Sequence, residues 1–377
     1  MSAATDWTVK RAEWAPRSRP SPPLGVTSAA VARSCGLRLL FERSDAYARR
    51  LSFAARIGTA FHRTMERLSE EGVPANAAEA ALIAQVVFDD ELAAQALAAD
   101  TAFREGSLPR DERRVQLAKE AAVAEAVRMA RNPQTSTPTE TAAGGVPGAG
   151  DGTWVEVPVA SADGWLRGRI DRIERHAGRL RLVDYKSTLR ADLPERYERQ
   201  VKVYAAMWEQ TFGFWPNEAA IVYPLLGTEA TLELNPEECT ELANDDSAVL
   251  REVCTRGAPR DHARPGDVCK ACEFRPWCEP FWAAQVSDAN TEADVLERAY
   301  LGFEGTVVEV LDGPGFVRGS VTWRGRPVSF IADPERFPQL RSARPGMNLR
   351  FLEWRLRGQR HAPQAFASDT GELFLVD

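Results

Sequence analysis

The sequence predicts an α/β core that carries a helical insert and is followed by a small β-barrel at the C-terminus. Apolar residues recur at helical spacing through most of the first 131 residues, and after residue 152 their period changes to two. Beyond residue 303, short β segments alternate with Gly and Pro turns. Because one core rarely exceeds roughly 250 to 300 residues, the 377 residues predict two domains.

The first half of the chain is mainly helical in pattern. Residues 1–26, rich in Pro, Ser and Arg, are expected to form an extended arm. Apolar spacing predicts helices over 27–51 and 57–68, and the Ala-rich residues 75–131 predict a helical insert. Residues 132–152 are low in complexity, so we expect a mobile loop there.

Strand patterns begin after this loop. Three segments alternate between apolar and polar residues and predict consecutive antiparallel strands: 154–159, 164–174 and 180–185. A helix, a strand and a second helix are predicted next, over 194–211, 219–225 and 237–256. This order indicates a central mixed sheet flanked by helices, in a domain that spans residues 27–296.

The last part of the chain, residues 297–377, predicts a five-stranded barrel of the OB-like or SH3-like kind. Its β segments are 303–311, 316–323, 327–331, 349–356 and 372–376. OB barrels often bind single strands by stacking bases on aromatic side chains, for which the candidates are Phe316, Trp323, Phe330, Phe351 and Trp354. A small barrel also needs aromatic residues inside it, so docking of a partner protein fits equally well.

Charge and hydropathy restrict the kinds of partner. The net charge of −7 argues mildly against nucleic acid as an average, yet residues 33–67 and 165–204 are both locally basic. No apolar run reaches the ~18 residues of a membrane span, and residues 1–20 lack the apolar stretch of a secretory signal. We therefore expect a cytoplasmic protein that has no membrane partner.

Two aspartates and a lysine form the most informative group. Asp171 ends the segment Gly-Arg-Ile-Asp, and Asp184 and Lys186 lie on the next predicted strand, so a hairpin can bring both carboxylates to one end of the sheet. Carboxylates suit Mg²⁺, and an ammonium beside them can hold the attacking water and offset charge on a phosphate. Taken alone, an Asp-x-Lys pattern on a strand is more often a surface ion pair.

Other motifs surround this group in the sequence. His62 ends the pattern Gly-x-x-x-His on a predicted helix, and Gln200 and Tyr204 share one face of the helix that follows Lys186. In this order, the patterns GxxxH, GxxD, DxK and QxxxY resemble the PD-(D/E)XK nuclease superfamily, and its RecB-like branch in particular, over residues 35–280.

The resemblance implies a restriction-endonuclease-like fold with a divalent metal site. His62, Asp171 and Asp184 would bind Mg²⁺ or Mn²⁺ together with the backbone carbonyl of Tyr185. Glu156, on the strand before Asp171, occupies a position where related enzymes often carry a further acidic residue.

The resemblance also implies roles for the remaining motif residues. Lys186 would assist the nucleophile, and Gln200 and Tyr204 would contact the substrate. The helical insert and the loop between His62 and Glu156 depart from the compact core of the family and would alter substrate access.

Six cysteines are unevenly spread: Cys35, Cys239, Cys254, Cys269, Cys272 and Cys278. The last three have the spacing CxxCxxxxxC, which indicates a soft metal or a cluster, because the cytosol keeps thiols reduced. Zinc would need a fourth ligand such as His262 or Cys254, and an iron-sulfur cluster typically takes four cysteines.

RecB-like nucleases of the AddB type and of the CRISPR-adaptation type carry one cysteine before the histidine helix and three after the core, and this sequence is similar. The resemblance implies that Cys35, Cys269, Cys272 and Cys278 hold a structural 4Fe-4S cluster. Cys239 and Cys254 fall in a predicted helix and are expected to be buried.

Together these patterns predict a metal-dependent deoxyribonuclease, acting as an exonuclease on single-stranded or end-bearing DNA in repair, recombination or defence against foreign DNA. The alternative is a DNA-binding scaffold subunit that works with a partner helicase or nuclease complex. The intact Asp171, Asp184 and Lys186 argue against a scaffold. A zinc-stabilised RNA-processing enzyme is a third hypothesis, because the site does not itself distinguish ribose from deoxyribose.

Overall fold

The computed structural model describes residues 7–101, 104, 111–131, 151–188, 193–287, 299–359 and 362–377. The chain divides into two compact units. The barrel unit consists of Met1–Pro20, Ser34–Arg50 and Thr255–Asp377, and the sheet unit consists of Ser21–Arg33 and Leu51–Cys254. These units do not follow the boundary expected between residues 296 and 297, so the division into a nuclease domain over 27–296 and a barrel over 297–377 stays a prediction.

The sheet unit is built on a mixed β-sheet with the order β2-β4-β5-β6-β7, and β3 pairs with β4. The strands are β2 (Leu24–Gly25), β3 (Gly152–Ala160), β4 (Leu166–His176), β5 (Arg179–Tyr185), β6 (Glu218–Tyr223) and β7 (Thr228–Glu233). The β3-β4-β5 meander is antiparallel, as predicted, whereas β5 and β6 run parallel. The predicted α/β architecture with a mixed sheet is confirmed.

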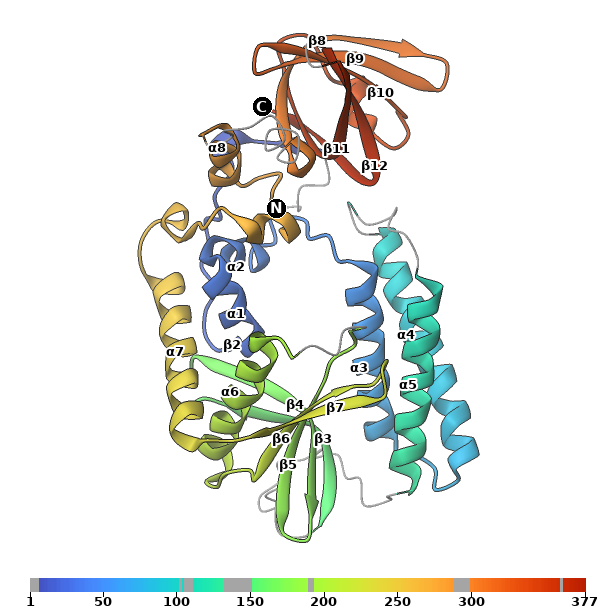
Figure 1. The fold of residues 1–377 in the computed structure, drawn as a ribbon, viewed down its shortest axis with the longest axis vertical. Coiled ribbons are helices and arrows are strands. Elements are labelled where there is room, and N and C mark those ends of the chain that lie inside the picture. The colour runs from blue at the N-terminus through green and yellow to red at the C-terminus, as the bar shows by residue number, and fades with distance from the viewer. Residues whose placement is uncertain are drawn as a thin grey trace. The chain divides into compact units, whose positions relative to one another are not determined.

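Helices cover both faces of this sheet (Figure 1). One side carries α3 (Phe53–Glu71), α4 (Ala77–Thr101) and α5 (Glu112–Arg131), and the other carries α6 (Glu195–Phe212) and α7 (Pro236–Thr255). Side chains of β5 and β6 form one apolar core with α3, α4 and α5. The sheet therefore lies between two layers of helices.

The local sequence explains where α3 begins and how it packs. The Ser52 hydroxyl accepts a hydrogen bond from the backbone N–H of Ala55, which caps the first turn. Ile57, Phe61 and Leu68 recur at helical spacing and are at most 2% exposed. This buried stripe orients the helix so that His62, next to Phe61, lies at the margin of the core.

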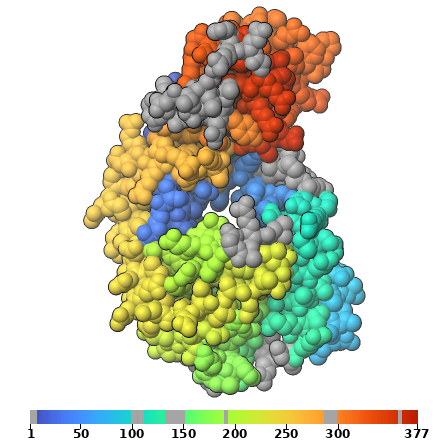
Figure 2. All heavy atoms as spheres, in the orientation of Figure 1, coloured from blue at the N-terminus to red at the C-terminus, as the bar shows by residue number. Residues whose placement is uncertain are grey.

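The helices α4 and α5 fill the range predicted for the helical insert and pack against each other and against α3. Figure 2 shows them as an outer layer of the sheet unit. The mobile loop expected over 132–152 lies outside the described residues, apart from Asp151 and Gly152.

The barrel unit contains a closed five-stranded β-barrel with the order β12-β10-β9-β8-β11, in which β11 pairs back onto β12. The strands are β8 (Phe303–Gly313), β9 (Phe316–Trp323), β10 (Arg326–Ala332), β11 (Asn348–Gln359) and β12 (Ala362–Val376). The β10–β12 pair is parallel and the other barrel pairs are antiparallel. The predicted barrel is confirmed, and it is consistent with an OB-like barrel.

Four of the five aromatic side chains that were candidates for base stacking fill the barrel interior, and Phe316 is not among them. Phe330, Phe351 and Trp354 are 0% exposed, and Trp323 is 9% exposed. A base cannot stack on a ring that is enclosed by other side chains, so the stacking prediction is wrong for these four residues. They are inside because a barrel of this size needs large apolar groups to fill its interior.

Some elements differ from the sequence prediction. The helix expected over 27–51 is divided into α1 (Val26–Ser34) and α2 (Gly36–Glu42) by the extended backbone of Cys35. Within the arm expected over 1–26, residues 7–26 include the short strands β1 (Thr8–Val9) and β2. The strand β7 and the helix α8 (Glu279–Ser287) were not predicted. Among the described residues, no helix combines the length and the apolar composition needed to cross a membrane.

Candidate active site

Glu156 on β3 lies across from Asp171 on β4. The strands pair Val155 with Arg172 and Val157 with Ile170, which brings Glu156 and Asp171 opposite each other. The φ angle of Glu156 is 53°, a left-handed conformation that costs a non-glycine residue roughly 1 to 2 kcal/mol. Such strain persists only where the surrounding structure imposes it, and it is concentrated at functional sites.

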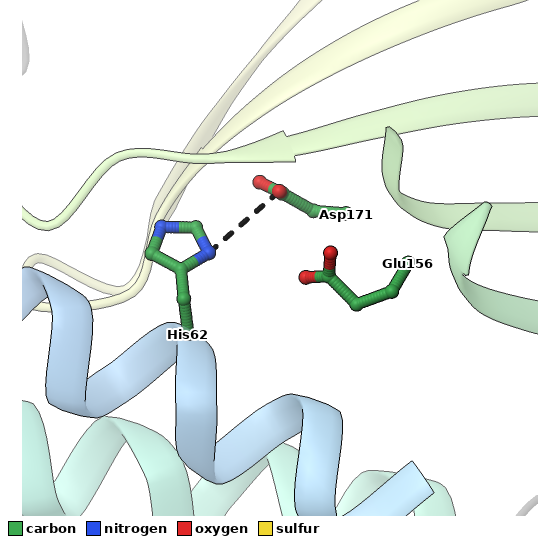
Figure 3. A group of neighbouring side chains, drawn as sticks. All are labelled: His62, Glu156 and Asp171. Carbon is green, nitrogen blue, oxygen red and sulfur yellow. Dashed lines mark ion pairs between the residues drawn. The ribbon is translucent and has the colours of Figure 1, made fainter. Parts of the chain in front are cut away.

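His62, Glu156 and Asp171 converge from α3, β3 and β4 (Figure 3). Each offers one ligand atom, and these atoms lie within 4.8 Å of one another. The His62 Nδ1 atom is 3.6 Å from Asp171 Oδ1. One imidazole nitrogen and two carboxylates make a donor set that suits Mn²⁺ and, through its oxygens, Mg²⁺. These residues therefore fit the divalent metal that the resemblance implies.

Asp171 is held in place by the neighbouring strand. The backbone N–H of Tyr185 donates a hydrogen bond to Asp171 Oδ2, with an N–O distance of 2.6 Å. This bond fixes one carboxylate oxygen and leaves Oδ1 on the side of His62. Tyr185 thus contacts Asp171 through its backbone N–H. That the Tyr185 carbonyl binds a metal stays a prediction.

Asp184 and Lys186 form a buried ion pair beside this group. Asp184 is 4% exposed, and the Lys186 Nζ atom is 2.5 Å from its Oδ2 atom. The ammonium also donates to Gln200 Oε1 at 2.9 Å and lies 4.9 Å from the centre of the Tyr197 ring. Three partners therefore fix Lys186, and two of them come from α6.

Burial perturbs the acids of the site. Burial raises the pKa of Glu156 to about 8, and the nearby carboxylates of Asp171 and Glu66 add to the effect. Burial likewise raises the pKa of Asp184 to about 6, with Lys186 opposing the shift and Asp171 adding to it. When carboxyl groups cluster in this way, a proton or a cation has to balance their negative charge. A bound divalent ion would therefore lower the pKa values of Glu156 and Asp184 again.

The two motif glycines mark close approaches between elements. A Cβ atom on Gly58 would lie 2.6 Å from the Ser187 hydroxyl, just after β5. A Cβ atom on Gly168 would lie 2.4 Å from the Tyr204 ring. The motifs GxxxH and GxxD thus contain glycine because α3 passes close to Ser187, after β5, and α6 passes close to β4.

Tyr204 is buried in the protein, and Gln200 is partly buried beside the site. Gln200 holds Lys186, and Tyr204 is 8% exposed and packs on Gly168. Contacts with a substrate stay a prediction for both residues. The sequence did not identify Tyr197, although it lies one helical turn before Gln200, a spacing that would have suggested it.

The four predicted cluster cysteines come together within the barrel unit. Cys35, Cys269, Cys272 and Cys278 line one small, mainly apolar pocket and form no disulfide. Burial raises the pKa of Cys272 to about 12 and that of Cys278 further, and the neighbouring sulfurs contribute. Cys239 is buried in α7, as predicted.

Comparisons with known proteins were made for sequence and for structure. No curated protein sequence matches this chain significantly. The matched structures include tetrameric p202 HIN2, with 9% identity, a TM-score of 0.18, and coverage of 20% of this chain and 40% of that one. SSO0001 has 19% identity, a TM-score of 0.23 and coverage of 34% and 60%. A murine DNA binding protein bound with ds DNA has 8% identity, a TM-score of 0.17 and coverage of 58% and 90%.

This chain spans less than two thirds of the first two structures, and similarity at such TM-scores carries no argument about function. The model of the PD-(D/E)XK nuclease superfamily, in contrast, matches residues 23–279. This range covers more than half of the sequence and includes every residue discussed at the site. The chain therefore belongs to the PD-(D/E)XK nuclease superfamily.

Proposed function

We propose that this protein is a metal-dependent deoxyribonuclease of the RecB-like branch, which hydrolyses phosphodiester bonds with Mg²⁺ or Mn²⁺. The observation that carries the proposal is the convergence of His62, Glu156 and Asp171 within 4.8 Å. Beside them, the buried pair of Asp184 and Lys186 supplies a fixed ammonium.

His62, Glu156 and Asp171 would hold the cation, and Asp184 and the Tyr185 carbonyl complete the set that the family resemblance implies. A bound divalent ion supplies Lewis-acid stabilisation of the phosphate and lowers the pKa of a coordinated water. The protein itself keeps Asp171 oriented through the Tyr185 N–H.

Lys186 orients the attacking water and offsets the negative charge that develops on the phosphate. Its three partners reduce the conformational freedom of the ammonium before the substrate arrives. Asp184 forms a buried ion pair with this ammonium and so holds it at the reaction centre. The loss of Lys186 would then lower kcat more than it changes substrate binding.

DNA would approach along the edge that carries His62. The exposed side chains of Arg63 and Arg169 lie there, both paired with Glu66, and provide positive charge for a phosphate backbone. We propose single-stranded or end-bearing DNA as the substrate, exonuclease action, and a role in repair, recombination or defence together with a helicase or similar partner. The intact Asp184–Lys186 pair favours an enzyme over a DNA-binding scaffold.

We further propose that Cys35, Cys269, Cys272 and Cys278 hold a 4Fe-4S cluster. The four cysteines line one pocket, and four thiolates are the usual ligand set of such a cluster. The cluster would be structural, because it joins α2 to residues more than two hundred positions later.

The nuclease proposal is tested with labelled single-stranded, duplex and RNA substrates, using Mn²⁺, Mg²⁺ or EDTA. Wild type should cleave DNA only with a metal, and Lys186→Ala should lose at least about 100-fold in kcat. Lys119→Ala is the matched control, since Lys119 is also ion-paired, to Asp89, but lies on α5. Metal-independent cleavage, or equal rates for wild type and Lys186→Ala, would overturn the mechanism, and preferential cleavage of RNA would reassign the substrate.

A further inference from the structure

Glu125 is a half-buried carboxylate on α5, and two of its three hydrogen-bond partners lie on β4 and β5. Its side chain is 14% exposed and accepts a short hydrogen bond from the Tyr185 hydroxyl. It also accepts hydrogen bonds from Arg172 Nη1 at 2.5 Å and from Arg128 Nε at 3.0 Å. Glu125 lies in the helical insert, outside every motif found in the sequence.

Two of these partners are chain neighbours of the site residues. Arg172 follows Asp171 directly, and Tyr185 lies between Asp184 and Lys186. The backbone N–H of Tyr185 is the group that holds Asp171 Oδ2. Because successive side chains on a strand point to opposite faces, the Tyr185 ring lies on the α5 side, opposite Asp184 and Lys186.

The Tyr185 ring is enclosed, so the contact with Glu125 fixes it in one position. Tyr185 is 4% exposed, and its ring meets the Phe61 ring edge-on at 5.7 Å between centroids. The Arg172 guanidinium lies 5.3 Å from the centre of the same ring. Phe61 precedes His62 on α3, and Arg172 follows Asp171 on β4, so this packed group contains the chain neighbours of two metal-site residues.

We propose that Glu125 is a positioning residue of the active site: it fixes Tyr185 and Arg172, and through them the orientation of Asp171 and the placement of Lys186. The helical insert then completes the catalytic centre. This inference rests on the proposed nuclease function. Burial alone would raise the pKa of Glu125, but Arg128 and Arg172 outweigh burial and lower it to about 2, which keeps the carboxylate charged at neutral pH.

The test uses Glu125→Gln, Tyr185→Phe and the double variant, with Glu91→Gln as the matched control. Glu91 is also a half-buried glutamate of the insert, paired with Arg67 at 3.2 Å, and it contacts α3 rather than a catalytic strand. The measurements are kcat and KM for DNA, and the Kd of Mn²⁺ from calorimetry in the absence of DNA.

We expect Glu125→Gln to lower kcat by about 10- to 100-fold, since misplacement of about 1 Å has effects of this size, with KM within about twofold of wild type. The Kd of Mn²⁺ should rise, because Asp171 is held less firmly. The double variant should resemble the more damaged single variant, since both changes remove the same contact. Glu91→Gln should behave like wild type.

The inference would be overturned if Glu125→Gln kept the wild-type kcat and Kd. It would also be overturned if the losses in kcat of the two single variants multiplied in the double variant, or if Glu91→Gln had the same effect as Glu125→Gln. If Glu125→Gln does not fold, Tyr185→Phe decides, since it removes only the hydroxyl that Glu125 holds; wild-type kcat and Kd in that variant would refute the coupling. A wild type that binds Mn²⁺ but cleaves no DNA would refute the nuclease proposal, and the Mn²⁺ affinities would still decide the role of Glu125.

Discussion

Glu156→Gln is expected to make the metal-free protein more stable and at the same time to weaken the metal site. Glu156 is an acid whose ionisation is opposed by burial and by Asp171, which raise its pKa to about 8. In the unfolded chain the same carboxyl has its ordinary pKa of 4.5. A neutral amide of nearly the same size removes this difference and keeps the shape of the side chain.

The size and the sign of the effect follow from linkage. The stability that the protonated carboxyl provides is complete below pH 4.5 and is lost progressively as the pH rises toward 8, because the unfolded chain releases its proton first. One pH unit corresponds to about 1.4 kcal/mol, so at pH 7 the wild-type acid destabilises the metal-free fold by up to about 3 kcal/mol. Glu156→Gln should recover about 2 kcal/mol of this at pH 7 and almost none near pH 4.5.

The assay is urea unfolding at pH 5, 6, 7 and 8 in EDTA, repeated with Mn²⁺. In EDTA, the stability advantage of Glu156→Gln over wild type should grow with pH. With Mn²⁺ the order should reverse, because wild type binds the ion more tightly and gains more stability from it. Glu91→Gln is the control, since Glu91 is also a half-buried acid, paired with Arg67, and lies outside the site. An advantage that does not change with pH, or equal stabilisation of both proteins by Mn²⁺, would refute the reasoning.

Three further changes probe other parts of the structure. Gly168→Ala should destabilise the protein by about 1 to 3 kcal/mol in urea unfolding, because the new methyl group would meet the Tyr204 ring at 2.4 Å; wild-type stability would contradict this contact. Asp246→Ala removes a carboxylate that is 2% exposed and pairs with two arginines. The free energy of unfolding, followed by the melting temperature, should therefore fall by about 3 to 5 kcal/mol. A fall below about 1 kcal/mol would argue against this pairing. Cys272→Ser should lower the iron content and visible absorption of anaerobically purified protein, and colourless, iron-free wild type would defeat the cluster proposal.

Periodicity predicted most of the fold because burial imposes it directly. The β3-β4-β5 meander is antiparallel, and along β3 buried residues alternate with more exposed ones, so apolar and polar residues alternate in the sequence. The edge strand β7 escaped prediction because its residues Thr228–Glu233 are mostly polar and mostly exposed, so burial leaves little pattern in them. The barrel strands were found, but their aromatic side chains could not be assigned to the inside without the closed sheet.

The sequence predicted most residues of the candidate site, but it did not predict how their side chains are arranged. The motif spacing identified His62, Asp171 and the pair of Asp184 and Lys186. The position of Glu156 depends on its left-handed backbone and on the strand register, neither of which a short motif encodes. The proposed role of Glu125 depends on its contact with Tyr185, which lies sixty positions later in the sequence. No local sequence pattern contains such a contact.

The central claim is that His62, Glu156 and Asp171 hold one divalent cation, and calorimetric titration of Mn²⁺ into the full-length protein tests it most directly. Asp171→Asn should abolish the tight binding seen in wild type. Asp151→Asn, which alters a surface His–Asp pair of similar separation, 3.7 Å from His176, should leave that binding intact. Equal Mn²⁺ binding by wild type and Asp171→Asn would show that the cation, if bound, is held elsewhere, and would contradict the account.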